Sequence, residues 1–143
     1  MRGSNPLQKF KNLGVMTVPF GGETRQEAHH PGVDFANEMG TPIPAFVDGQ
    51  VTHVDDGHVQ GENNFGNSVT IKDANGDNHE FHHLHQIGVK PGQIVRKGQT
   101  VASMGNTGAT YSESGKGDGT HLDYRIVSAY GQFKNPMTYL RNF

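Results

Sequence analysis

The sequence contains no cysteine, which excludes disulfides and thiolate metal sites. It also lacks a long apolar run, so no transmembrane helix is expected. Its 12 Lys and Arg nearly balance 14 Asp and Glu, and the net charge is −2. This balance gives no electrostatic reason to expect nucleic acid or an anionic membrane as a partner. We therefore expect a protein that binds neither nucleic acid nor membrane.

Histidine and glycine, in contrast, are abundant, with 9 and 20 residues respectively. Histidine is the commonest metal ligand and the usual acid or base at neutral pH, and glycines indicate many tight turns. A chain of 143 residues fits one domain. The opening "MRGSNPLQKFK" lacks the apolar segment of a signal peptide, and "MRGS" resembles a vector-derived leader. We predict an extension over 1–14 and one domain over 15–143.

Short strand-like runs separated by turn signals make up most of the chain. "DANGDN" predicts a hairpin in which Asn75 and Gly76 adopt positive φ. Only "NPMTYLRNF" could be helical, with Asn135 as N-cap and Pro136 in the first turn. The pattern predicts an all-β fold, mainly an antiparallel sheet, sandwich or barrel, with a short C-terminal helix. The expected strands cover 14–20, 33–37, 41–47, 50–55, 67–73, 78–85, 93–104 and 121–127.

The first candidate site is "HHPGVD", in which His30 and Asp34 lie four residues apart. Pro31 and Gly32 between them argue against a helix, so we expect a loop carrying His30 to enter a strand carrying Asp34. Imidazole and carboxylate are both zinc ligands. Spacing alone leaves two interpretations open, half of a metal site or a structural pair.

Two further histidine-rich segments are predicted strands. In "FHHLH", alternation places His83 and His85 on one face and His82 on the other. In "GTHLDYRI", His121 and Asp123 project to the same side. A catalytic zinc has about three protein ligands and an open position for water, and hydrolysis also needs groups that move protons. Together the three segments offer both.

The order of these segments resembles the lysostaphin-type (LytM-like) zinc endopeptidases. It runs "HPGVDFANEMGTPIPAFVDGQVTHV", "NFGNSVTIKD", "FHHLHQIGVKPGQIVRKGQTVASMGNTG", "GTHLDYRI" and "NPMTYL", and covers about residues 19–140. The resemblance implies an antiparallel β core of the lysostaphin-like duplicated hybrid motif, with a groove bounded by loops. It also implies one Zn²⁺ ion and hydrolysis of peptide bonds in the stem or cross-bridge peptides of bacterial peptidoglycan.

Roles can be transferred by position within this resemblance. His30 and Asp34 match the H-x-x-x-D zinc ligands, while His83 and His121 match two catalytic imidazoles. The family's H-x-H supplies a second histidine as the third ligand, and here that position is Asp123. The resemblance therefore implies a metal shell of one histidine and two carboxylates.

This aspartate changes the expected chemistry. Carboxylate is an accepted zinc ligand, but Asp is shorter than His, so the strand or ion must shift. With two carboxylate ligands a divalent centre would be formally neutral, whereas the family's two histidines and one aspartate leave it at +1. A less positive centre lowers the pKa of its bound water less. We expect an alkaline-shifted activity optimum and better tolerance of Mn²⁺. The alternative is a degenerate site in which Asp123 does not reach the metal and the protein serves as a peptidoglycan-binding or regulatory module.

The other histidines are not expected to be metal ligands. We expect His29 to line the groove or to support the ligands, and His53, His58 and His79 to lie at the surface. A groove lined by 62–67 and 110–119 would accept an extended peptide. "VKPGQIVRKGQTVASMG" also resembles lipoyl or biotin carriers and sugar-phosphotransferase carriers, although Lys97 lies in the wrong half for the first kind. A cell-wall hydrolase would work in the extracellular or periplasmic wall, or as a phage tail or lysis protein.

Overall fold

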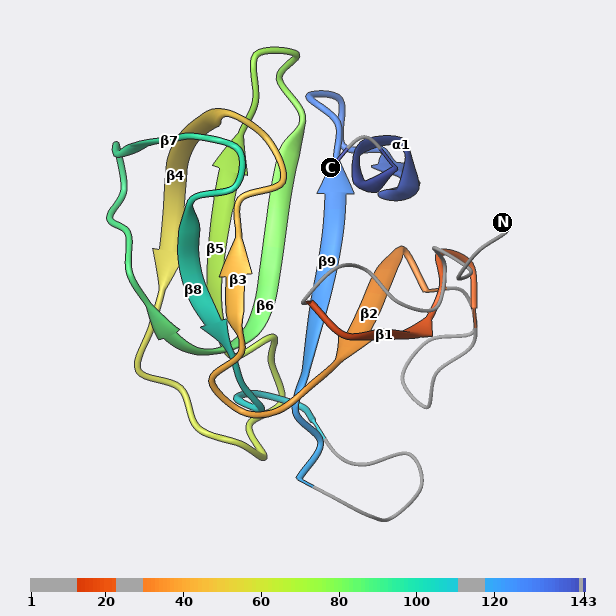
Figure 1. Cartoon of the computed structure of the whole chain (residues 1–143), viewed down its shortest axis with the longest axis vertical. Coiled ribbons are helices and arrows are strands. Elements are labelled where there is room, and N and C mark those ends of the chain that lie inside the picture. Colours follow the sequence, from red (N-terminus) through yellow and green to blue (C-terminus); the bar gives the residue numbers. More distant parts are fainter. Residues whose placement is uncertain (1–12, 23–29, 111–117, 142) are drawn as a thin grey trace.

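The computed structural model describes residues 13–22, 30–110, 118–141 and 143, and within them the chain is almost entirely antiparallel β-structure (Figure 1). The main path of the sheet runs β1-β2-β9-β6-β5-β4-β7, while β10 pairs with β9 and β8 pairs with both β3 and β6. This architecture confirms the expected fold class. The strands are β1 (Val15–Val18), β2 (Gly32–Ala36), β3 (Pro42–Pro44), β4 (Gly49–Asp55), β5 (Asn67–Lys72), β6 (Asn78–Ile87), β7 (Ile94–Val95), β8 (Thr100–Met104), β9 (His121–Val127) and β10 (Phe133–Lys134).

The β3–β8 pair lies in front of the long strands in Figure 1, and both layers contribute residues to the hydrophobic core, among them Ile43, Val101 and Phe81. Strand β9 shows how the sequence builds it, because Leu122, Tyr124 and Ile126 are all fully buried. The Tyr124 ring packs 4.7 Å from Phe46 and 5.1 Å from Phe81 between centroids. Such pairs add about 0.5–1.5 kcal/mol each beyond apolar burial. The alternate residues of β9 therefore face the other side of the sheet.

The predicted turn and helix are present with shifted details. In the hairpin between β5 and β6, Gly76 has a φ of 83°, but Asn75 does not have a positive φ. The Asp73 carboxylate instead accepts the backbone N–H groups of Asn75 and Asp77, which stabilises the turn. The helix α1 is short, Met137–Leu140, with Pro136 rather than Asn135 at the N-cap position.

Asn135 nevertheless caps this helix in the chemical sense, because its side-chain oxygen accepts the N–H of Met137 at 3.1 Å. In the described part of the chain, no helix combines the length and apolar character needed to cross a membrane. The predicted extension over 1–14 lies, except for its last two residues, outside the described residues.

Candidate metal and catalytic site

Three neighbouring strands place two of the predicted metal ligands, Asp34 and Asp123, in one row with His82. In the register of β2, β9 and β6, Asp34 lies opposite Asp123, and Asp123 lies opposite His82. Directly opposed residues of antiparallel strands point to the same face. His121 shares this face because it lies two residues before Asp123. The row therefore lies on the face of β9 that is turned away from the core.

His30, Asp34 and Asp123 form a buried cluster whose candidate ligand atoms all lie within 4.8 Å of one another. The Nε2 atom of His30 lies 2.8 Å from Oδ1 of Asp34 and 3.9 Å from Oδ1 of Asp123. As the sequence predicts, His30 precedes a strand that carries Asp34. One imidazole nitrogen and two carboxylate oxygens fit zinc, and also harder ions such as Mn²⁺. A divalent ion between them would replace the proton that His30 and Asp34 share.

The pKa values of the two carboxylates in the cluster shift in opposite directions. Burial raises the pKa of Asp34, the hydrogen bond with His30 opposes this, and the nearby Asp123 raises it further. Burial also raises the pKa of Asp123, but the hydrogen bonds and charge of Arg125 outweigh it, so the net pKa is lowered. Asp123 is therefore held ionised, as a metal ligand must be.

His83 lies beside this cluster in an unusual backbone conformation, with a φ of 64°. Its backbone N–H donates to the carbonyl of Phe65 at 2.9 Å. Its Nδ1 lies 2.7 Å from the carbonyl oxygen of Thr107, which only accepts, so Nδ1 carries the proton and Nε2 keeps its lone pair. Burial, aided by the neighbouring His121, lowers the pKa of His83 to about 4. At neutral pH, His83 is an uncharged imidazole whose Nε2 can accept a proton.

His121, like His83, directs its Nδ1 to a backbone carbonyl. Its Nδ1 lies 2.9 Å from the carbonyl oxygen of Gly119, so this nitrogen carries the proton. Its Nε2 lies 3.9 Å from Oδ2 of Asp34, and its ring centroid lies 4.8 Å from that of His83. The structure thus brings together all five residues predicted for the site, with two imidazoles beside three candidate ligands.

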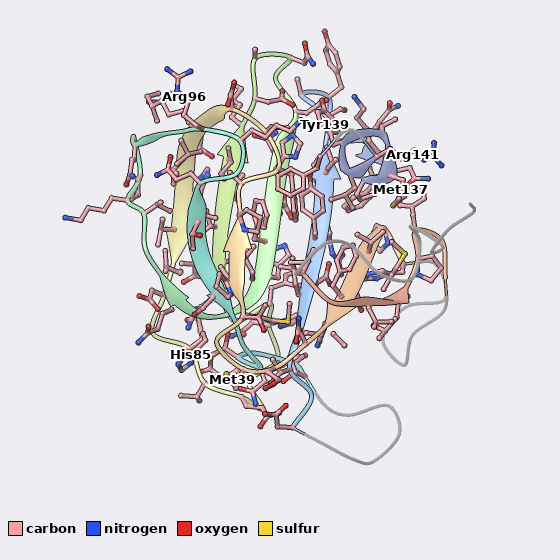
Figure 2. The ribbon with its side chains drawn as sticks, in the orientation of Figure 1. Met39, His85, Arg96, Met137, Tyr139 and Arg141 are labelled. Carbon is pink, nitrogen blue, oxygen red and sulfur yellow. The ribbon has the colours of Figure 1, made fainter. Side chains whose placement is uncertain are left out.

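The face assignments for β6 were partly wrong. His82 is buried on the face of the site, where it hydrogen-bonds Ser68 and Glu80 and stacks on Phe65 at 4.3 Å. His85 is exposed, at the lower periphery of the molecule in Figure 2, and does not share the environment of the buried His83. The reason is an irregularity in the β5–β6 register next to the positive φ of His83, which breaks the alternation.

The remaining histidines differ as well. His53 is exposed as expected, and His58 is half-buried and hydrogen-bonds Asp55 and Glu62. His79, expected at the surface, is fully buried and bonds the hydroxyl of Tyr124. Its alternation with Phe81 along β6 places it on the core side. His29 and most of the predicted loop 110–119 lie outside the described residues.

Sequence reasoning missed three residues that hold the site in place. The carbonyl oxygen of Thr107 accepts a hydrogen bond from Nδ1–H of His83, and the Phe65 ring stacks on His82. Nothing in the local sequence identifies either, because both contacts join distant segments. Arg125 bonds Asp123, and strand alternation in "HLDYRI" could have identified it, because the two residues are two apart.

The comparisons with known proteins decide which family this arrangement belongs to. The sequence matches "Peptidase family M23" over residues 28–136, which include all five site residues. The chain belongs to peptidase family M23. This membership removes the carrier-domain alternatives. The peptidoglycan DD-endopeptidase ShyA of Vibrio cholerae is 35% identical to this M23 domain over 104 residues, which are 73% of this chain and 21% of ShyA.

Other relatives and solved structures agree. The glycyl-glycine endopeptidase ALE-1 of Staphylococcus capitis is 29% identical over 120 residues, 80% of this chain and 30% of ALE-1. The catalytic domain of the prophage-encoded M23 protein EnpA from Enterococcus faecalis superposes with a TM-score of 0.72 at 30% identity, covering 92% of this chain and 95% of that one. Lysostaphin from Staphylococcus simulans superposes with a TM-score of 0.69 at 26% identity, covering 92% of this chain and 50% of lysostaphin. The M23 domain spans less than a third of these curated relatives.

Proposed function

We propose that this M23 domain is a zinc-dependent endopeptidase that hydrolyses peptide bonds in the stem or cross-bridge peptides of bacterial peptidoglycan. The observation that carries the proposal is the buried cluster of His30, Asp34 and Asp123, with the imidazoles of His83 and His121 next to it. The names of the relatives support the substrate, since they include DD-endopeptidases and a glycyl-glycine endopeptidase. A structural neighbour described as a zinc-containing peptidase from Vibrio cholerae supports the metal.

In this proposal, His30, Asp34 and Asp123 would hold the ion, which would supply Lewis acidity and lower the pKa of water. His83 and His121 are the catalytic imidazoles. Each has its Nδ1 proton directed to a backbone carbonyl, so each offers Nε2 to the reaction. The low pKa of His83 keeps it unprotonated near neutral pH, as a proton acceptor must be.

The degenerate alternative has less support. Asp123 lies beside His30 and Asp34 rather than turned out of the site, and the rings of His83 and His121 pack against each other. A pure binding module needs neither the buried carboxylate pair nor the two oriented imidazoles. The setting we propose is the extracellular or periplasmic cell wall. A phage tail or other virion-associated lysin is the second setting, suggested by the likeness to prophage-encoded EnpA.

Digestion of purified peptidoglycan tests the proposal. We expect the domain to release peptide fragments, a chelator to stop the release, and Zn²⁺ to restore it. Mass analysis of the fragments then identifies the bond. His121→Ala should lower the rate about 10²- to 10⁴-fold while metal content is retained, whereas the matched His53→Ala at an exposed position should not. Release that continues in chelator, or no release from metal-loaded protein, would refute the proposal.

A further inference from the structure

Arg125 lies on the same face of β9 as Asp123 and holds its carboxylate with two hydrogen bonds. Its Nε donates to Oδ1 at 2.9 Å and its Nη2 donates to Oδ2 at 2.8 Å. Both side chains are buried, with 5% of Arg125 and 3% of Asp123 exposed. A two-bond guanidinium–carboxylate pair fixes the plane of the carboxylate as well as its position. The orientation of Asp123 is therefore set by Arg125.

The surrounding residues form a site for this guanidinium. Gly32 lies opposite Arg125 on β2, and a Cβ there would come within 2.7 Å of Cγ of Arg125. The absence of a side chain at Gly32 lets Arg125 lie across that strand. The Phe65 ring packs over the guanidinium, with its centroid 4.6 Å from Cζ of Arg125. Gly32 therefore leaves room for the stem of Arg125, while Phe65 packs over its guanidinium.

The two hydrogen bonds do not exhaust the Asp123 carboxylate. Each carboxylate oxygen has two lone pairs, and Arg125 uses one on each. Oδ1 also lies 3.9 Å from Nε2 of His30, inside the candidate metal cluster. The oxygen that accepts the hydrogen bond from Nε of Arg125 is thus the same oxygen that lies 3.9 Å from the candidate ligand His30. The hydrogen bond from Arg125 therefore leaves a lone pair on Oδ1 that could bind a metal ion.

Arg125 also changes the charge of the centre. A divalent ion with the carboxylates of Asp34 and Asp123 would be formally neutral, and the guanidinium adds one buried positive charge. The alkaline shift expected from the ligands alone is therefore reduced, because the +1 charge is restored by a neighbour rather than by a ligand.

We infer that Arg125 is a positioning residue that makes the short side chain of Asp123 an oriented metal ligand. The inference rests on the proposed metal site and deepens it. A residue that orients a ligand typically contributes 10- to 100-fold to metal affinity. Arg125→Lys tests this most cleanly, because it keeps the positive charge and removes the two-bond geometry.

The experiment measures Zn²⁺ affinity of wild type and Arg125→Lys by competition with a chromophoric chelator. Thermal unfolding of both metal-free proteins is measured in parallel. We expect about 10- to 100-fold weaker Zn²⁺ binding in Arg125→Lys, and no change in the matched control Arg96→Lys at an exposed position (Figure 2). Unchanged or tighter Zn²⁺ binding in Arg125→Lys, with or without a lower melting temperature, would overturn the inference. If wild type itself binds no Zn²⁺, the proposed function fails first.

A measurement on wild type applies even where Arg125→Lys does not fold. The Nε–H of Arg125 is buried and hydrogen-bonded, so its NMR signal should exchange slowly with water. We expect this signal to persist when Zn²⁺ is added, because the Arg125–Asp123 pair stays intact in the loaded site. Loss of slow exchange on metal binding would show that Asp123 leaves Arg125, which contradicts the inference.

Discussion

The neutral state of buried His83 should make the metal-free protein sensitive to mild acid. Its pKa is about 4 in the folded protein, mainly because it is buried, against an ordinary value of 6.5. Since the folded pKa is the lower one, the unfolded chain takes up this proton first as the pH falls. The contribution of neutral His83 to the free energy of unfolding is therefore complete above about pH 6.5 and is lost progressively toward pH 4.

The magnitude follows from these two values. Each pKa unit is worth about 1.36 kcal/mol, so the complete loss is about 3 kcal/mol, of which about 2 kcal/mol falls between pH 7 and pH 5. The variant His83→Asn removes the titrating group and retains a residue that tolerates positive φ. Between pH 7 and pH 5, its free energy of unfolding should fall by about 2 kcal/mol less than that of wild type.

Urea unfolding in the presence of chelator measures this difference. His53→Asn is the matched control, because His53 is exposed, and it should show the wild-type loss. If His83→Asn loses as much stability between pH 7 and pH 5 as wild type does, His83 is not the buried neutral group described above.

Two further predictions concern the support and the charge of the site. Thr107→Val should lower the free energy of unfolding by about 2 kcal/mol. The Thr107 hydroxyl accepts the N–H of Asn67 at 2.9 Å and donates to the carbonyl of Leu84 at 2.8 Å, and valine can do neither. Urea titration at pH 7 measures the change, and a loss below about 0.5 kcal/mol contradicts it. Asp123→His replaces a carboxylate with a neutral ligand and makes the centre more positive, so the optimum of peptidoglycan hydrolysis should move to lower pH. A pH–rate profile identical to wild type would refute the assigned role of Asp123.

Most of the site could be predicted from sequence where it follows strand alternation. The period of two in "HLDYRI" correctly puts His121 and Asp123 on one face, and the same rule extended by two residues reaches Arg125. Alternation failed at His83, because a positive φ in a residue other than glycine depends on tertiary contacts. Those contacts are the carbonyls of Phe65 and Thr107, and neither is near His83 in the sequence.

The approach of the Phe65 and Thr107 loops also depends on tertiary packing. A Cβ at Gly66 would lie 2.4 Å from atoms of Thr107, so glycine is required where the two segments touch. A glycine within "NNFGN" predicts a turn from sequence, and only the fold shows that the turn lies against the segment that bonds His83.

Anomalous diffraction at the zinc absorption edge, from crystals of wild type grown with Zn²⁺, tests the central claim most directly. We expect one strong peak among His30, Asp34 and Asp123, about 2.0–2.2 Å from a nitrogen of the first and an oxygen of each of the others. A peak bound without Asp123, or no peak between these three side chains, would contradict it.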